Sequence, residues 1–564
     1  MPIKNFCYCI GGVGSKISEV AGHLCAMNMI DAKDITFIVV DKDDDCGGTA
    51  KARKLLETVT ALADVERNPD TALVRSVGND KEFCKSKMDA FNWKFSASMS
   101  ALTGAANDAS LKEALIAKDN QTTRKSDEML LDAFYSHKEQ QKETTGGFYG
   151  HPSIGALIFK YMVKKSNWIP TAANNNLIDN ADIAYPIREY LRAANNNVAK
   201  VFIIGSIFGG TGASIFSNLA HYIRSSLGKD DIKRVLISGA LMLPYFTFPA
   251  QAGGMIDPID FYSKSVVALK QYGNDENLLR SSKDSRASFD SIYVCGQSPL
   301  HCIAENYCDS GKNQKNHFNL VDLLAAQAMT EFFNAEYDYN EEDFTKYERG
   351  LYEYRFAPDN VEKVTLSNTV NIEKPLKAMT AFCTYFITRT YASVKYDNPR
   401  HSAVLRNLLD RGGILGTNSE LNKYNDQYKT TVEPIVDSVF AYCCSFVEFM
   451  YDISHNGIDW SRGQNSQAEH YALFNPDYFE RLHQITVGFK GDEDGQRQAI
   501  KACNSNDNAD YVLDAKGITC QFVQDKLNEM FDKKPQEYKD AGTDVKQRIG
   551  DYIHSAFKVC FENV

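Results

Sequence analysis

Three glycine-rich segments follow apolar runs and precede helical patterns, and they carry the clearest chemical signal in the chain. Gly209-Gly210-Thr211-Gly212 follows a buried-type strand predicted at 201–204 and precedes a helix predicted over 215–226. Glycine is needed where a backbone approaches a ligand closely or takes a positive φ. Backbone N–H groups at a helix start, together with the Thr211 hydroxyl, favour phosphate. For this segment alone, a tight turn without a ligand is the alternative.

The first of the three segments is Gly11-Gly12-Val13-Gly14. It lies between an apolar run and an amphipathic stretch, and the strand predicted at 35–40 then ends in Asp41. Two common fingerprints are excluded. Ile17 occupies the third glycine position of a dinucleotide-binding Gly-x-Gly-x-x-Gly, and Lys16 follows a serine rather than the glycine of a Walker A loop. The order strand, loop, helix, strand still predicts a helix N-terminus that faces an anion.

The remaining segment, 146–152, precedes a helix predicted over 153–164. Further strands at 234–243 and 291–295 flank a helix at 257–272. Strands that alternate with helices predict an α/β fold with a Rossmann-like, doubly wound parallel sheet. A long central helix joins this sheet to a second α+β domain with helical additions. The predicted units are an α/β domain at 1–315 with a polar, helical insertion at about 50–144, a central helix at 316–336, and the second domain with its C-terminal extension at 337–564. Helices are predicted in the second domain at 376–390, 432–451 and 544–559.

The composition is that of a globular protein with an acidic surface. Of the 564 residues, 43% are hydrophobic and 24% are charged, and the formal net charge is −11. An acidic chain without a Lys/Arg block argues against nucleic acid as a partner. Pro244 and Pro249 interrupt the longest apolar stretch, so no membrane span is expected. The chain has no secretory leader pattern, and its 14 cysteines lack metal-site or disulfide spacing, which predicts reduced thiols in the cytoplasm.

The three loops, taken in this order, resemble those of the tubulin/FtsZ superfamily of GTPases, and the chain is similar to a divergent bacterial tubulin-like protein. The resemblance covers about residues 5–335, is interrupted by the polar insertion, and fades beyond them. The motifs that carry it are Ile10–Gly14, Ile38–Asp43, Gly147–Gly155, Gly205–Ser214, Leu243–Phe248 with its Pro-x-Phe-x-Phe pattern, and Phe289–Val294.

The resemblance implies that GTP and Mg²⁺ bind at these loops. Asp43 would hold Mg²⁺ through water, although a solvated turn is an equal alternative. Asn319 or Asp322, at the start of the central helix, would contact the guanine. The nucleotide-binding residues that the resemblance implies are Gly11, Gly12, Val13, Gly14, Asp41, Asp43, Gly147, Gly150, Gly209, Gly210, Thr211, Gly212, Ala213, Asn319 and Asp322.

The chain departs from the family pattern at three positions. Residues 208–214 correspond to the family's signature loop and are called the signature loop below. Phe208 and Ser214 replace its first and last glycines, which implies a narrower pocket or a changed phosphate register. Pro249 stands where the family has a ribose-binding glutamate. Asp257 or Asp260 is the candidate to replace it.

In this superfamily, acids from the next subunit orient the water that attacks the γ-phosphate. Asn371 and Glu373 resemble the start of that motif and are the predicted catalytic residues, although Leu376 occupies the position of the third acid. The acidic stretch 338–343 is the alternative. Catalysis of this kind depends on positioning and charge stabilisation, so these acids have to lie at a subunit interface.

We therefore expect a GTP-binding and GTP-hydrolysing cytoskeletal protein that assembles head to tail into filaments. Its partner is a second copy of itself, and the insertion or the C-terminal region could bind a further, unidentified protein. One alternative is a nucleotide-binding regulator of the same fold that does not polymerise. An NAD-dependent oxidoreductase is a weaker alternative, because the dinucleotide fingerprint is missing.

Overall fold

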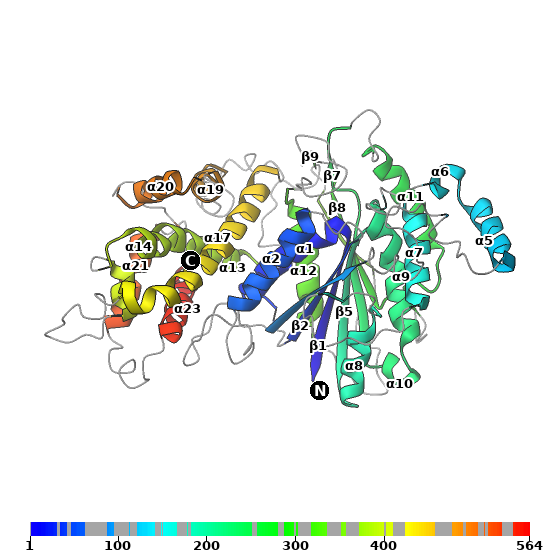
Figure 1. Cartoon of the computed structure of the whole chain (residues 1–564), viewed down its shortest axis with the longest axis horizontal. Helices are drawn as coiled ribbons and strands as arrows, with labels where there is room; N and C mark the ends of the chain where they lie inside the picture. Colours follow the sequence, from blue (N-terminus) through cyan, green and yellow to red (C-terminus); the bar gives the residue numbers. More distant parts are fainter. Residues whose placement is uncertain are drawn as a thin grey trace.

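Figure 1 shows the fold of the chain in a computed structural model. The residues that the structure describes are 2–30, 34–41, 47–62, 87–94, 112, 121–141, 148, 151–165, 177–178, 182–250, 257–279, 287–297, 301–302, 317–335, 351–356, 372–399, 402–409, 424–456, 476–488, 492–505, 513, 517–532 and 545–564.

The centre of the molecule is an eight-stranded sheet in which every pair of neighbouring strands is parallel. Its spatial order is β10-β8-β6-β5-β1-β2-β3-β4, so the chain winds outward in both directions from the β1–β5 pair. The expected doubly wound parallel sheet is therefore confirmed. The strands are β1 (Ile3–Ile10), β2 (Asp34–Asp41), β3 (Lys87–Lys94), β4 (Leu177–Ile178), β5 (Val198–Ser206), β6 (Val235–Met242), β8 (Ser291–Gln297) and β10 (Leu351–Phe356).

The central strands β5 and β6 are buried along their whole length because helices cover both faces of the sheet. Every residue of β5 and β6 is buried, as a parallel sheet between two helical layers requires. Right-handed crossovers that leave β1 and β5 in opposite directions place their helices on opposite faces. In Figure 1, α1 (Gly11–Ala26), α2 (Gly47–Leu62) and α12 (Leu320–Asn334) lie on one side of the strands, and α7 (Pro152–Lys165), α8 (Tyr185–Ala193), α9 (Gly210–Ser226), α10 (Lys229–Ile232) and α11 (Asp260–Gly273) lie on the other.

β3, β10 and the two-residue β4 are strands of the central sheet where the sequence predicts none. The stretch at about 50–144, expected to be a polar, helical insertion, contributes α2 and β3 to the central fold, and β3 pairs with β2 along its full length. Among the described residues of this stretch, α5 (Gln121–Phe134) and α6 (His137–Gln140) match the expectation of added helices. β10 comes from the predicted second domain but extends the sheet beyond β8. Polar side chains interrupt the apolar pattern of β3 and β10, so neither strand forms an apolar run that the sequence alone would reveal.

Residues 372–564, called the helical unit below, follow β10. The described part of this unit contains helices and no named strand, where an α+β domain was expected. The helices predicted at 376–390, 432–451 and 544–559 are all present. The unit comprises α13 (Glu373–Tyr385), η3 (Phe386–Tyr391), α14 (Ala392–Tyr396), α15 (Ala403–Leu409), η4 (Tyr424–Tyr428), α17 (Lys429–Asn456), α19 (Pro476–His483), η6 (Gln484–Gly488), α20 (Glu493–Ser505), α21 (Cys520–Asp532) and α23 (Val545–Asn563).

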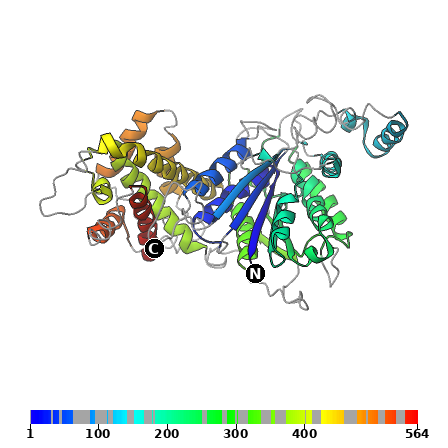
Figure 2. The ribbon, with the colours of Figure 1, turned by 60° about the horizontal axis from the view of Figure 1, so that its bottom comes forward.

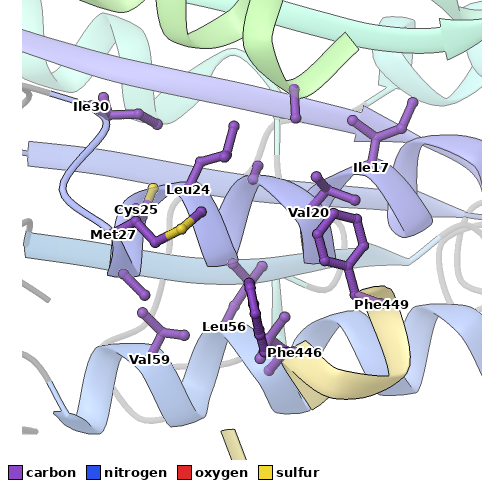
Figure 3. Packing of buried hydrophobic residues seen from close by; sticks show 14 of the residues in the cluster. Ile17, Val20, Leu24, Cys25, Met27, Ile30, Leu56, Val59, Phe446 and Phe449 are labelled. Carbon is purple, nitrogen blue, oxygen red and sulfur yellow. The ribbon is translucent and has the colours of Figure 1, made fainter. Parts of the chain in front are cut away.

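The helical unit lies on the α1/α2 side of the sheet, as Figure 2 shows from a second direction. Its longest helix, α17, packs against α2. Phe446 and Phe449 of α17 reach the apolar side chains of α1 and α2 (Figure 3). The His23 ring of α1 is stacked on Phe449 at 5.4 Å between centroids. This contact joins the helical unit directly to the helix that follows the first glycine loop. None of the described helices has the length and apolar character needed to cross a membrane.

Candidate functional site

The first glycine loop and the signature loop meet at the carboxyl ends of β1 and β5. Gly11 starts α1 directly after β1 and has φ +71°, a conformation that favours glycine. A Cβ atom on Gly11 would lie 3.3 Å from both the Gly212 nitrogen and the Thr211 Cβ. Two loops about 200 residues apart in sequence are therefore in contact at the point where the strand order reverses. Ligands bind at such switch points in doubly wound sheets.

The backbone of the first loop is open on one side and packed on the other. A Cβ on Gly12 would meet no atom within 4 Å, whereas one on Gly14 would lie 2.6 Å from the Cys9 carbonyl carbon. Gly12 and Val13 are partly exposed, and Gly14 is buried. Gly14 thus allows α1 to pack closely against β1, and Gly12 faces free space at the start of the helix.

The signature loop likewise has some positions that are partly exposed and one glycine that is closely packed. Gly209 and Gly210 are partly exposed at the start of α9, and Ala213 is also partly exposed. Gly212 is buried, and a Cβ there would lie 2.6 Å from the nitrogen of Ser206 at the end of β5. The open positions leave backbone N–H groups of the first turn of α9 accessible.

The two substituted positions of this loop face the protein interior. Phe208 is buried, with its ring 4.8 Å from that of Phe261 and 5.5 Å from that of Phe246. The expectation that Phe208 narrows the pocket is not supported, because its ring belongs to this aromatic cluster. The Ser214 hydroxyl donates to the Gly210 carbonyl, and a Cβ on Gly155 of α7 would clash with Ser214. Ser214 therefore forms part of the α7–α9 contact.

Asp41, at the end of β2, joins the two loops to α2. Its carboxylate accepts a hydrogen bond from Thr211 Oγ1 at 3.3 Å and from Thr49 Oγ1 at 3.5 Å. Ser15 Oγ of α1 lies 3.2 Å from Thr49 Oγ1. Sequence reasoning missed Thr49. The Gly47-Gly48-Thr49 sequence at the start of α2 repeats the Gly-Gly-Thr of the signature loop and could have revealed it.

The start of α12 is the expected base end of the site. Asn319 is the N-cap of α12 and is fully buried, and its Oδ1 accepts from the Val321 backbone N–H at 3.0 Å. Its amide nitrogen, Nδ2, is buried and has no hydrogen-bond partner among the described residues. Two donor hydrogens on Nδ2 are therefore available to an acceptor.

Asp322 has a structural role instead of the expected contact with a base. Its carboxylate is fully buried and is bound by Lys16 Nζ at 3.0 Å, Tyr245 Oη at 2.5 Å and the Asn319 backbone N–H at 2.8 Å. Burial, followed by the charge of Asp322, raises the pKa of Tyr245 well above its usual value. With three donors on its two oxygens, the Asp322 carboxylate is committed to the packing of α1 on α12, and we correct its assignment accordingly.

The remaining predicted residues are not part of this described cluster. Glu373 is the first residue of α13 in the helical unit. Asp257 and Asp260 are exposed at the start of α11. The positions that lie outside the described residues are Asp43, Gly147, Gly150, Asn371 and the acidic stretch 338–343. Among the described residues, no group of three or more His, Cys, Asp or Glu side chains is arranged to hold a metal ion.

The fold and the loops define a doubly wound α/β protein in which the starts of two helices meet at the switch point of the sheet. Residues 112–256 match a protein-family model described as tubulin like. The matched segment is about a quarter of the chain and runs from before α5 through α7 and the signature loop to beyond β7 (Phe246–Thr247). This part of the chain is thus similar to tubulin-like proteins. No curated protein matches the chain.

Proposed function

We propose that the protein binds GTP at the crevice between the first glycine loop and the signature loop. The observation that carries this proposal is the contact of Gly11 with Gly212 and Thr211 at the switch point, beside the open backbone of Gly12. Two helix N-termini, those of α1 and α9, meet there. Their unpaired N–H groups and their dipoles favour the negative charge of phosphates.

The residues around the crevice fit a nucleoside triphosphate. Lys16 is engaged by Asp322 and by the His317 carbonyl, so we assign phosphate binding to backbone N–H groups rather than to a lysine. The Thr211 hydroxyl, which donates to Asp41 in this structure, would turn to a phosphate oxygen when the nucleotide binds. The donors on Asn319 Nδ2 suit the O6 acceptor of guanine. Mg²⁺ in nucleotide sites is held by one or two carboxylates together with phosphate oxygens and water. Asp41 and Asp43 are the carboxylates we propose for it.

We further propose that the protein hydrolyses GTP and assembles head to tail in the cytoplasm. Asn371 and Glu373 of one subunit would then complete the site of the next, since catalysis here requires acids positioned beside the γ-phosphate. A heterologous contact that does not close generates a filament. α11 supports self-association, because it presents an apolar stripe of the kind that interfaces bury. The exposed side chains are Ile259, Tyr262, Val266, Val267 and Leu269.

Nucleotide binding is tested by titrating the protein with a fluorescent GDP analogue. Thr211→Ala removes a hydroxyl that we assign to phosphate, and we expect roughly a tenfold or greater loss of affinity, in line with a hydrogen bond to a charged group. Thr49→Ala is the matched control, because it removes a hydroxyl from the same Asp41 carboxylate without touching the signature loop. Equal effects of the two variants would mean that Thr211 only holds Asp41.

Assembly and hydrolysis are tested together with GTP and Mg²⁺. We expect the protein to sediment and scatter light with a slowly hydrolysed GTP analogue, and electron microscopy to show filaments. The rate of phosphate release per molecule should rise with protein concentration, because the site is completed between subunits. A rate independent of concentration, without filaments, would favour the non-polymerising regulator.

A further inference from the structure

α17 of the helical unit contacts the nucleotide-binding half through two acidic side chains one helical turn apart. Glu448 Oε1 lies 2.8 Å from Lys51 Nζ of α2, two residues after Thr49. Asp452, the second acid, is 3% exposed and binds the segment that leads into α12. The two acids therefore contact two different elements: Glu448 contacts α2, and Asp452 contacts the segment just before α12.

The carboxylate of Asp452 binds two consecutive residues. Its Oδ1 lies 2.8 Å from His317 Nδ1, and its Oδ2 accepts the Phe318 backbone N–H at 3.0 Å. The hydrogen bond from His317 to Asp452 raises the pKa of that histidine above its usual value. Both oxygens are thus used on the chain just before Asn319. Because the carboxylate is buried, these hydrogen bonds have little competition from water.

α1 and a ring of α17 also contact these two residues. Lys16 Nζ donates to the His317 carbonyl at 3.2 Å while it pairs with Asp322. The Phe318 ring packs edge-on against Phe449 of α17, with 5.3 Å between centroids. Figure 3 shows Phe449 where α17 meets α1. The backbone that enters Asn319 is therefore clamped between α1 and the helical unit.

We propose that Asp452 is a positioning residue that sets the orientation of Asn319 and, through it, the selectivity for guanine over adenine. This inference rests on the proposed function, in which Asn319 contacts the base. A hydrogen bond weakens steeply as its angle departs from linearity, so a small rotation of residues 317–318 alters what Asn319 can recognise. A site built on hydrogen bonds to one base rejects an analogue that leaves those groups unpaired.

The experiment compares the dissociation constants of GDP and ADP by competition against a fluorescent GDP analogue. Asp452→Leu removes both acceptors and keeps the branched, four-atom shape of the side chain. We expect GDP affinity to fall about tenfold, the effect of one lost hydrogen bond, with ADP affinity nearly unchanged because the phosphate contacts remain. Asp437→Leu is the matched control. Asp437 is also on α17, but it pairs with Lys395 inside the helical unit and is half exposed.

The outcomes separate this inference from the proposed function. A wild-type protein that does not prefer GDP to ADP overturns the guanine-binding proposal and the inference with it. A wild-type preference that survives unchanged in Asp452→Leu, or that Asp437→Leu lowers equally, overturns the inference alone. If Asp452→Leu does not fold, His317→Ala replaces it, since that side chain is 41% exposed and supplies one of the two contacts. His317→Ala has to lower the GDP preference in the same direction, and no change would refute the role of Asp452.

Discussion

The openness of the backbone at Gly12 allows one substitution to separate folding from phosphate binding. A Cβ at this position meets no atom within 4 Å, so Gly12→Asp introduces no clash. Gly12 is the second residue of α1, and a carboxylate in a first helical turn is stabilised by about 0.3–1 kcal/mol through the helix dipole. Replacing glycine in a helix also lowers the entropy of the unfolded chain, which contributes about 0.4–1 kcal/mol. We therefore expect the free energy of unfolding to stay constant or to rise.

The same carboxylate opposes a bound phosphate. Two unit charges about 4 Å apart repel by roughly 4 kcal/mol at the effective dielectric constant of a protein surface. Since ~1.4 kcal/mol corresponds to a tenfold change in affinity, Gly12→Asp should weaken GDP binding by about 10²- to 10³-fold. Gly12→Asn has nearly the same size without the charge, so the difference between the two variants measures the electrostatic part.

The measurement pairs fluorescent-GDP titration with thermal unfolding. Gly273→Asp is the control, because a Cβ at Gly273 also meets open space, but on exposed α11. It should bind GDP like the wild type. The reasoning is refuted if Gly12→Asp unfolds at or above the wild-type temperature and still binds GDP within about tenfold of it, since ~1.4 kcal/mol is far below the expected repulsion.

Two further predictions concern buried titratable groups of α1. Burial raises the pKa of Glu19 from its ordinary value of 4.5 to about 8. Between these two pH values the folded protein keeps a proton on Glu19 that the unfolded chain has released. The free energy of unfolding therefore falls as the pH rises from 4.5 to 8. Glu19→Gln should therefore raise the melting temperature by several degrees at pH 8 and have little effect at pH 5. An equal effect at both values would contradict this. Burial lowers the pKa of His23 from 6.5 to about 3, so the folded protein loses stability as the pH falls below 6.5. His23→Phe keeps an aromatic ring packed on Phe449 and removes the titrating group. Its melting temperature should therefore fall less than that of the wild type when the pH is lowered. Unchanged acid sensitivity would show that other groups control it.

Much of the fold could be predicted because its signals are local. The apolar run of β5 and the glycines that follow it define a strand, a turn and a helix start within about 20 residues. The 28 residues of α17 show an apolar face with helical spacing that predicts a helix before any packing is known. Repeated strand–helix alternation then leaves few topologies, and a doubly wound parallel sheet is the common one.

β3 and β10 could not be predicted in this way. Their sequences, Lys87–Lys94 and Leu351–Phe356, are short and carry polar or charged residues at alternate or irregular positions. Each becomes a strand because the open edge of an existing strand, β2 or β8, provides hydrogen bonds along its length. Strand propensity depends on such neighbours more than on the residues themselves.

The candidate site also has parts that could be predicted from the sequence and parts that only the folded structure reveals. Residue type and spacing alone predict that Gly11–Gly14 and Gly209–Gly212 are loops of the phosphate-binding type, because the conformational freedom of glycine is a property of the residue. Only the folded chain pairs Lys16 with Asp322, joins Asp41 to Thr49, and brings Asp452 against the residues before Asn319. These partners lie up to about 300 residues apart in sequence, and they come into contact only once the helices have packed.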